Sequence, residues 1–294
     1  MAARDRATAV GFIAVVLWGA LALLTTFSSG LPPFQLTALT FATAFLLMLT
    51  RWLLAGINPI QFARQPLRVW ALGVGGLFGY HLCYFVALAN APAVEASMIA
   101  YFWPLLIVVF SALIAGKKLD KGMQAGVIAA LLGSWLLLWK PGAGFAVEYL
   151  TGYLAAMLAA LIWAGYSVLS ARLKTVATDT IGWFCGATAL IAWLFHLQFE
   201  QTHWPLSNSQ WLGVLLLGAG PVGVAFLCWD FGVKRGDIQL LGVLSYAAPL
   251  ISTLLLIVVG EAEGSINVWL GTGLIVGGAW LASRQRRSEV KTLA

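Results

Sequence analysis

The sequence predicts an all-α membrane protein with ten transmembrane helices, arranged as two inverted five-helix repeats around a central cavity. Three observations support this prediction. The 294 residues are 61% hydrophobic and 10% charged, with a mean hydropathy of +0.90, whereas soluble chains are about a quarter charged. Apolar runs of about 20 residues, the length that crosses a bilayer core about 30 Å thick, recur along the whole chain. The two halves of the chain also match each other in sequence.

Short breaks rich in proline, glycine or charge separate the apolar runs, as at Pro32-Pro33 and Pro141-Gly142. Backbone polar groups cannot stay unpaired in lipid, so each run is expected to be helical. None of the breaks is long enough to hold a separate soluble domain. The first run is longer than the core of a secretory signal and is expected to be a retained helix. The expected helices span residues 7–26, 34–55, 67–90, 92–115, 121–139, 148–173, 180–197, 209–233, 238–260 and 265–284.

A shift of 145 residues superposes one half of the chain on the other, which divides it into residues 1–145 and 146–294. An odd number of helices in each half places the two copies in opposite membrane orientations. In transporters, such inverted halves enclose a site near the middle of the bilayer and rock to open alternate faces. The matched positions are Trp18 with Trp163, Tyr101 with Tyr246, Pro104 with Pro249, Cys83-Tyr84 with Cys228-Trp229, and Gly126, Gly133 and Trp135 with Gly271, Gly278 and Trp280.

The distribution of positive charge predicts the orientation of the chain. With ten spans and a cytoplasmic N-terminus, sixteen of the seventeen Lys and Arg residues lie on one side, and only Lys140 lies on the other. Because cytoplasmic loops carry the excess of Lys and Arg, both termini are expected to be cytoplasmic in a multi-pass protein of the inner membrane. The net charge of +6 follows from this bias, so it does not indicate nucleic-acid binding. The opposite side holds Glu148, Glu200, Glu261 and Glu263.

Four stretches, in this order along the chain, carry a family resemblance. They are Tyr101-Phe102-Trp103-Pro104-Leu105, Gly116-Lys117-Lys118, Ala160-Leu161-Ile162-Trp163-Ala164-Gly165-Tyr166 and Leu244-Ser245-Tyr246-Ala247-Ala248-Pro249. Over essentially its whole length the chain resembles the EamA type of the drug/metabolite transporter superfamily, and within it the aromatic amino-acid exporter branch called YddG. The resemblance implies export of aromatic amino acids. One departure is Gly116-Lys117, where wider relatives have Gly-Glu, whereas the second half keeps Gly260-Glu261.

Aromatic side chains are the first candidates for contact with a transported solute. Many of the 14 Trp residues, such as Trp269, fall near predicted membrane interfaces, where an aromatic belt explains them. Others lie deeper, and such rings can stack on a planar solute or hold an ammonium group, at about 0.5–2 kcal/mol per contact. Ordinary bundle packing is the alternative for each of them. The candidate substrate-binding residues are Trp18, Tyr80, His81, Tyr84, Tyr101, Trp103, Trp163 and Tyr246.

Ionisable residues inside the membrane are candidates for function because burying them is costly. His81 and Glu95 are the candidates for ion or proton coupling, although facilitated exchange would need neither. Glu95 follows Pro92 by three residues, so its alternative role is that of an acid in the first turn of a helix. Asp230 precedes Lys234 by four residues, and this spacing predicts a helical ion pair near the cytoplasmic face.

Pro104 and Pro249 occupy matching positions inside the fourth and ninth expected helices. A proline in a helix removes one backbone hydrogen bond and bends the helix. We predict that these two residues act as hinges that let the ends of their helices move as gates. A static packing kink is the alternative.

The function predicted from these features is export of small organic solutes, most of all aromatic and other neutral amino acids, by alternating access. The alternative is broad efflux of aromatic cationic drugs, or another metabolite permease of this fold. An enzyme is not expected, because no nucleophile is placed with a base and no metal-ligand spacing occurs. Cys83, Cys185 and Cys228 all fall inside predicted spans. We expect a monomer in the lipid bilayer that binds a small molecule and uses no metal or cofactor.

Overall fold

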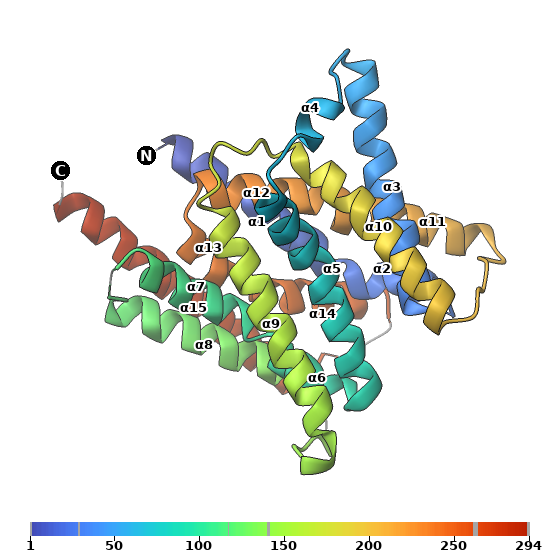
Figure 1. Ribbon diagram of the computed structural model, residues 1–294. Helices are drawn as coiled ribbons and strands as arrows, with labels where there is room; N and C mark the ends of the chain where they lie inside the picture. The colour runs from blue at the N-terminus through green and yellow to red at the C-terminus, as the bar shows by residue number, and fades with distance from the viewer. Residues whose placement is uncertain (1, 29, 117, 140–141, 261–263, 293–294) are drawn as a thin grey trace.

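The computed structural model describes residues 2–28, 30–116, 118–139, 142–260 and 264–292, and every regular element in these ranges is helical (Figure 1). Lys117, Lys140, Glu261 and Glu263 lie outside the described residues. The elements are α1 Ala2–Gly19, α2 Leu21–Phe27, α3 Pro33–Leu54, α4 Ile60–Ala63, α5 Leu67–Asn90, α6 Ala93–Ala100, α7 Trp103–Ile114, α8 Lys121–Leu138, η1 Val147–Tyr149, α9 Leu150–Ser170, α10 Thr180–Phe199, α11 Asn208–Leu217, η2 Gly218–Val224, α12 Ala225–Arg235, α13 Ile238–Leu244, α14 Ala247–Val258 and α15 Ile266–Thr292.

The described residues contain nine candidate membrane spans, and a tenth if one bent pair of helices is taken as a single span, as the sequence predicts. Nine helical segments are long and apolar enough to span a bilayer, and α1 with α2 makes a tenth span bent by 41°. Four of the nine combine shorter elements, namely α6 with α7, η1 with α9, α11 with η2 and α12, and α13 with α14. Large apolar side chains such as Leu54, Leu67 and Val258 are more than 80% exposed on the surface of the bundle, as expected for contact with lipid.

The packing of the helices follows an inverted two-fold pattern. The most extensive interfaces join α8 with α15, α5 with α9, α3 with α10, and α1 with α12. The shift of 145 residues converts α1 into α9 and α5 into α12, so it exchanges the α1–α12 and α5–α9 interfaces. The same shift maps the α3–α10 and α8–α15 interfaces onto themselves. Each half therefore packs mainly on the other, as the prediction of two inverted five-helix repeats requires.

Glycine permits the closest of these helix contacts, between α8 and α15. An added Cβ atom at Gly126 would lie 2.6 Å from the carbonyl oxygen of Gly278, and one at Gly133 would lie 2.7 Å from that of Gly271. The two contacts are exchanged by the shift of 145 residues. Small residues at such crossings let two backbones approach in a membrane, where apolar burial alone does not hold helices together.

The spans that surround the middle of the bundle are interrupted rather than straight. A turn at Tyr101 and Phe102 separates α6 from α7, and a turn at Ser245 and Tyr246 separates α13 from α14. The eighth span contains the π-helical segment η2, which holds Pro221. Breaks of this kind occur at functional sites, because they free backbone groups that must then find other partners.

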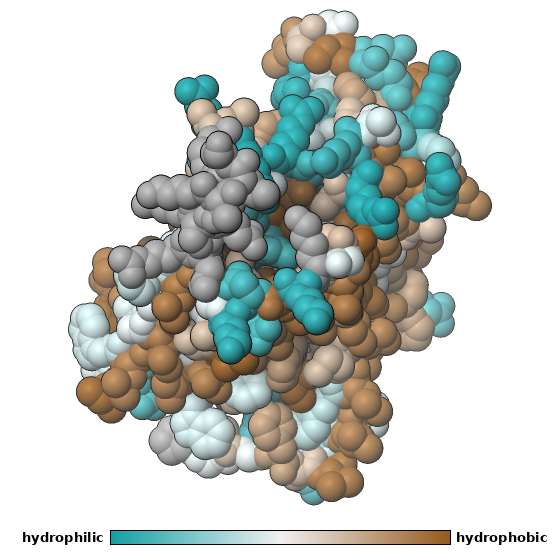
Figure 2. Space-filling model, turned by 90° about the vertical axis from the view of Figure 1, so that its left-hand side faces the viewer, coloured by the Kyte–Doolittle hydropathy of each residue, from teal (hydrophilic) through white to brown (hydrophobic). Residues whose placement is uncertain are grey.

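One end of the bundle, here called the basic end, carries most of the described cationic side chains. There α1 and α5 begin, and α3, α9 and α12 end, near the N-terminus and α4 in Figure 1. Figure 2 shows hydrophilic side chains gathered in the upper part of one face and apolar ones over its lower part. Among the described residues, two ion pairs join different elements at this end: Arg4 with Asp237 at 3.0 Å, and Arg51 with Asp179 at 2.7 Å.

The opposite end is held by a partly buried polar network around Glu200. Its two carboxylate oxygens accept the backbone N–H groups of Phe34 and Gln35, at 2.9 and 3.1 Å, in the first turn of α3. His196, which is fully buried, lies 2.9 Å from Glu200 through Nδ1 and 2.8 Å from the Thr202 hydroxyl through Nε2. An acid at this place stabilises the helix start, where unpaired N–H groups carry partial positive charge.

Candidate functional site

Five aromatic side chains, here called the aromatic cluster, meet in the middle of the bundle. They come from both halves, and they are Trp18 of α1, Trp103 of α7, Trp163 of α9, and Phe226 and Trp229 of α12. The ring centroid of Trp18 lies 5.1 Å from that of Trp229, 5.6 Å from that of Trp163 and 6.1 Å from that of Trp103. Most of these ring pairs meet edge to face or tilted, the arrangements that the charge distribution of aromatic rings favours. The structure therefore brings together Trp18, Trp103 and Trp163 of the predicted site.

Hydrogen bonds orient two of these rings. The indole N–H of Trp18 donates to the carbonyl oxygen of Pro221, at 3.0 Å, inside the π-helical segment η2. The indole N–H of Trp229 donates to the hydroxyl of Ser167 on α9, also at 3.0 Å. Each bond joins helices from different spans, so the ring positions depend on how those spans sit against each other.

A row of side chains on α5 extends the cluster toward α6. The ring of Tyr80 lies 5.6 Å from that of Trp163 and is stacked on Tyr84 at 5.9 Å, with 7° between the planes. The hydroxyls of Tyr84 and Ser97 lie 3.0 Å apart, which links α5 to α6. Of the predicted residues, Tyr80 therefore touches the aromatic cluster directly, and Tyr84 is joined to it through Tyr80.

His81 lies beside this row and packs against both Tyr80 and α3. Its Nδ1 atom lies 2.7 Å from the carbonyl oxygen of Leu77, a bond that requires the proton on Nδ1. Its ring contacts those of Phe41 and Tyr80, at 5.2 and 5.4 Å between centroids. These contacts give the ring a defined orientation next to Tyr80.

Neither Tyr246 nor Tyr101 makes a ring contact with the aromatic cluster, although the Tyr101 hydroxyl is close enough to those of Tyr80 and Tyr84 to interact with them electrostatically. Tyr246 is fully buried in a second core group, with Val243 and Leu250, and its hydroxyl accepts the backbone N–H of Leu105 at 3.2 Å. Tyr101 is half-buried and packs against the same core group. The structure thus places these two tyrosines at the breaks of the fourth and ninth spans, and Tyr246 joins one break to the other.

Glu95 lies in the first turn of α6, as the structural interpretation of the sequence predicts. It is 4% exposed, and its Oε1 atom accepts the backbone N–H of Gly144 at 2.8 Å. Its Oε2 atom is buried and has no hydrogen-bond partner among the described residues. This carboxylate therefore joins α6 to the connection between the fifth and sixth spans, at the end opposite the basic end.

Pro104 and Pro249 lie just after the helix breaks rather than at them. Pro104 is the second residue of α7 and Pro249 the third residue of α14. A proline in the first turn of a helix loses no hydrogen bond within that helix, because the first N–H groups have no partner there. The two prolines therefore separate each half-helix from the one before it.

Replacing both prolines by alanine is expected to slow exchange of labelled substrate several-fold while leaving the amount of membrane protein unchanged. The new N–H groups can bond across the breaks, which makes the two spans stiffer. The rate is measured in proteoliposomes, with Pro33→Ala as the control, because Pro33 begins α3 and has no half-helix before it. Normal exchange in the double variant would remove the hinge role.

Two members of the aromatic cluster, Phe226 and Trp229, are absent from the residues that the sequence singles out as a site. The internal repeat holds the signal that could have found Trp229, because it matches Tyr84, which is one of the predicted site residues. Pro221 is also missed, since its role is to present a carbonyl oxygen to Trp18. The repeat also matches Phe226 with His81, another predicted site residue, whereas no comparable sequence signal marks Pro221.

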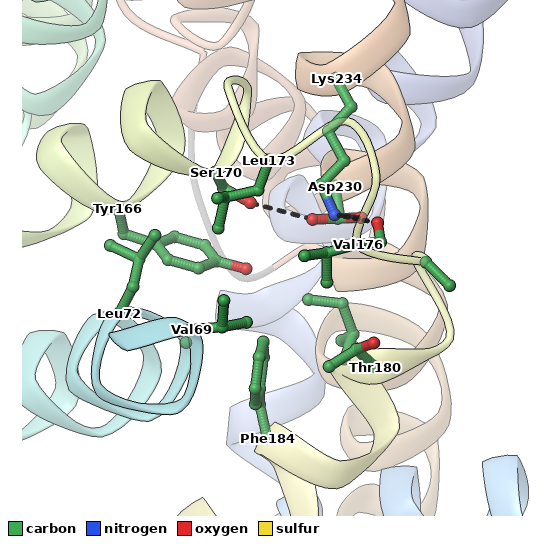
Figure 3. A pocket seen from close by; sticks show the side chains of 13 residues that line it. Val69, Leu72, Tyr166, Ser170, Leu173, Val176, Thr180, Phe184, Asp230 and Lys234 are labelled. Atoms are coloured by element: carbon green, nitrogen blue, oxygen red, sulfur yellow. Dashed lines mark hydrogen bonds and ion pairs between the residues drawn. The ribbon is translucent and has the colours of Figure 1, made fainter. Parts of the chain in front are cut away.

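A second polar group lies at the basic end and contains the predicted ion pair. The Nζ atom of Lys234 lies 2.9 Å from the Oδ2 atom of Asp230, which confirms the predicted pairing of the two side chains. Both side chains are buried, and they border a small cavity together with Tyr166 and Ser170 (Figure 3). Among the described residues, no group of three His, Cys, Asp or Glu side chains could hold a metal ion.

Ten apolar crossings in two inverted halves, with an aromatic cluster drawn from both halves, define a multi-pass membrane protein of the inverted-repeat transporter class. A family model gives the specific assignment. The model of the EamA-like transporter family matches residues 6–139 and 150–284, and the chain belongs to this family. This result confirms the resemblance read from the sequence.

Individual relatives agree with the family assignment. The chain is 50% identical over 282 residues to the "Aromatic amino acid exporter YddG" of Ancylobacter novellus, with 95% of this chain and 98% of the relative covered. It is 28% identical to the protein of the same name from Escherichia coli strain K12, over 96% and 99% of the two chains. The "Pseudopaline exporter CntI" of Pseudomonas aeruginosa is 28% identical over 74% of this chain and 75% of its own.

A solved crystal structure has the same fold. It is 49% identical in sequence and superposes with a TM-score of 0.91, covering 97% of this chain and 99% of the other. The ten-helix arrangement described above is therefore also that of an experimentally determined relative.

Proposed function

We propose that this chain exports aromatic amino acids, together with other neutral amino acids, out of the cytoplasm by alternating access. The observation that carries the proposal is the aromatic cluster, in which Trp18 and Trp103 of the first half face Trp163 and Trp229 of the second. A site built across two inverted halves changes shape when one half rocks against the other. The names of the relatives support aromatic amino acids as the substrate.

The chemistry of the cluster suits an aromatic amino acid. Ring faces and edges can replace the contacts that the tryptophans make with one another, at about 0.5–2 kcal/mol for each ring or ammonium contact. Trp103, Trp163 and Trp229 are less than 10% exposed, so a bound side chain would be removed from water. Binding then separates rings that touch in this conformation, which couples substrate entry to movement of the helices.

The moving bodies in this proposal are residues 1–145 and 146–294. Both termini lie in the cytoplasm, the protein is in the inner membrane, and the monomer is the working unit. The cation-rich basic end then faces the cytoplasm, in accord with the charge bias of bacterial inner-membrane proteins. Transport by this route needs no cofactor and no chemical step.

The test is counterflow in proteoliposomes loaded with unlabelled amino acid. Labelled phenylalanine and tryptophan are expected to accumulate transiently inside loaded vesicles, whereas labelled aspartate and lysine are not. A parallel assay with a quaternary ammonium dye tests for efflux of aromatic cations, and a pH gradient tests for proton coupling. Purified protein without counterflow of any neutral or aromatic amino acid would overturn the proposal.

A further inference from the structure

The buried charges at the basic end have a defined set of partners. Asp230 accepts hydrogen bonds from Ser170, at 3.0 Å to Oδ1, and from Thr178, at 2.7 Å to Oδ2. Lys234 donates to the carbonyl oxygen of Val176 at 3.0 Å, in addition to its contact with Asp230. The pair belongs to α12, whereas the other partners lie at the end of α9 and in the connection that follows it. These contacts close the basic end between the sixth and eighth spans.

Packing alone gives no reason for charges at this place. A buried ion pair loses its water, and well-packed apolar residues of similar size are often as stabilising or more so. The other half of the protein follows this rule, because the shift of 145 residues converts Asp230 into Phe85 and Lys234 into Ala89. The fold therefore does not depend on a charged pair at the matching position. Ionisable groups buried within a membrane span are commonly part of a substrate pathway.

The cavity beside the pair has two chemically distinct sides, as Figure 3 shows. Asp230, Lys234 and Ser170 form the polar side, and Val69, Leu72 and Phe184 line the apolar side. An amino acid with an aromatic side chain has the same division, with both charges at one end and a ring at the other. The lining therefore matches this class of molecule in chemistry, and the cavity, about 10 Å³ in this conformation, must widen to admit it.

The cavity also lies next to the aromatic cluster. Tyr166 borders the cavity, and its ring centroid is 5.3 Å from that of Trp163. Ser167, the next residue on α9, holds the indole N–H of Trp229. A molecule that enters from the basic end therefore meets the charged pair first. The tryptophans lie beyond it, on the other side of the Tyr166 ring.

We propose that Asp230 and Lys234 form a receiving site at the basic end, where Asp230 binds the ammonium group and Lys234 the carboxylate of the incoming amino acid. The inference rests on the proposed function and names the site that substrate meets before the aromatic cluster. When the α9–α10 connection moves away, Ser170, Thr178 and the Val176 carbonyl leave the pair, and the substrate takes their place. The Asp230–Lys234 pair carries no net charge, and neither does the zwitterionic amino acid. Binding therefore brings no net charge into the membrane interior.

The test compares three ligands as inhibitors of phenylalanine counterflow: unlabelled phenylalanine, phenethylamine, which lacks the carboxylate, and 3-phenylpropionate, which lacks the ammonium group. Lys234→Met is expected to weaken inhibition by phenylalanine about tenfold, the effect of losing one charged hydrogen bond. The same variant should strengthen inhibition by phenethylamine, because a repelling charge is gone. Asp230→Asn is expected to weaken inhibition by phenylalanine and to strengthen inhibition by 3-phenylpropionate. Arg235→Gln is the control, since Arg235 is exposed on the same helix end and its loss should change none of the three.

A single substitution leaves the other charge buried without its partner, so the double variant D230N/K234M is measured as well. The double variant contains no unpaired charge at this site. Inhibition by phenylalanine should weaken about tenfold, whereas inhibition by indole, which has no charge, should stay unchanged. Equal changes for all ligands in every variant, or phenylalanine binding as in the wild type in the double variant, would overturn the receiving site alone. Absence of counterflow in the wild type would instead overturn the proposed function and this inference with it.

Discussion

Replacing Trp163 by alanine is expected to lower phenylalanine exchange by roughly 10–100-fold, since each aromatic contact contributes about 0.5–1.5 kcal/mol and this ring makes several. Its ring lies within 6.4 Å, between centroids, of those of Trp18, Tyr80, Trp103 and Trp229. Removing it takes away the side chain that joins the cluster to the row on α5. The rate is measured by counterflow in proteoliposomes at matched protein content.

Two further variants show whether the loss is specific. Trp103→Ala removes another ring of the cluster and should also lower exchange, whereas Trp269→Ala should change it little. Trp269 is 65% exposed near a predicted membrane interface, so its loss removes a lipid contact and leaves the cluster intact. Equal loss in all three variants would count against a central binding site.

The second large effect is expected at the crossing of α8 and α15. An added Cβ atom at Gly278 would lie 2.4 Å from the carbonyl oxygen of Gly126 and 3.0 Å from the backbone nitrogen of Ala130. Both are backbone atoms, so the two helices must move apart. Gly278→Ala should therefore lower the free energy of unfolding by about 1–3 kcal/mol, the usual effect of overpacking.

Gly277 provides a matched control one residue away. A Cβ atom there meets nothing within 4 Å, so Gly277→Ala should leave stability unchanged or raise it by up to about 1 kcal/mol, because alanine favours the helix. Both variants are compared with the wild type by thermal unfolding in detergent. A loss of stability in Gly277→Ala as large as that in Gly278→Ala would show that the effect does not depend on the close contact between α8 and α15.

The candidate site could be predicted in part, and the internal repeat explains which part. Trp18 and Trp163 are repeat-matched, and they do meet in the middle of the bundle. Tyr101 and Tyr246 are matched in the same way, yet they pack in a second core group. A matching position in the repeat predicts equivalent helix positions, but it does not say which way a side chain points within the bundle.

The sequence by itself determined the class of protein, the number of crossings and the inverted duplication. These follow from local properties, because an apolar run of sufficient length in lipid must be a helix, and an odd number of helices inverts the second copy. The charge bias likewise needs no tertiary information to predict an orientation.

Only the tertiary structure decided which side chains meet. The hydroxyl groups that bond Asp230 lie 52 and 60 residues away in the chain. The indole of Trp18 bonds a carbonyl 203 residues away, at a π-helical break that hydropathy does not reveal. Such contacts depend on the rotation of each helix about its axis and on where the spans break. Both the rotation and the breaks are set by close packing among helices that are apolar on nearly every face. They therefore cannot be predicted from any single stretch of sequence.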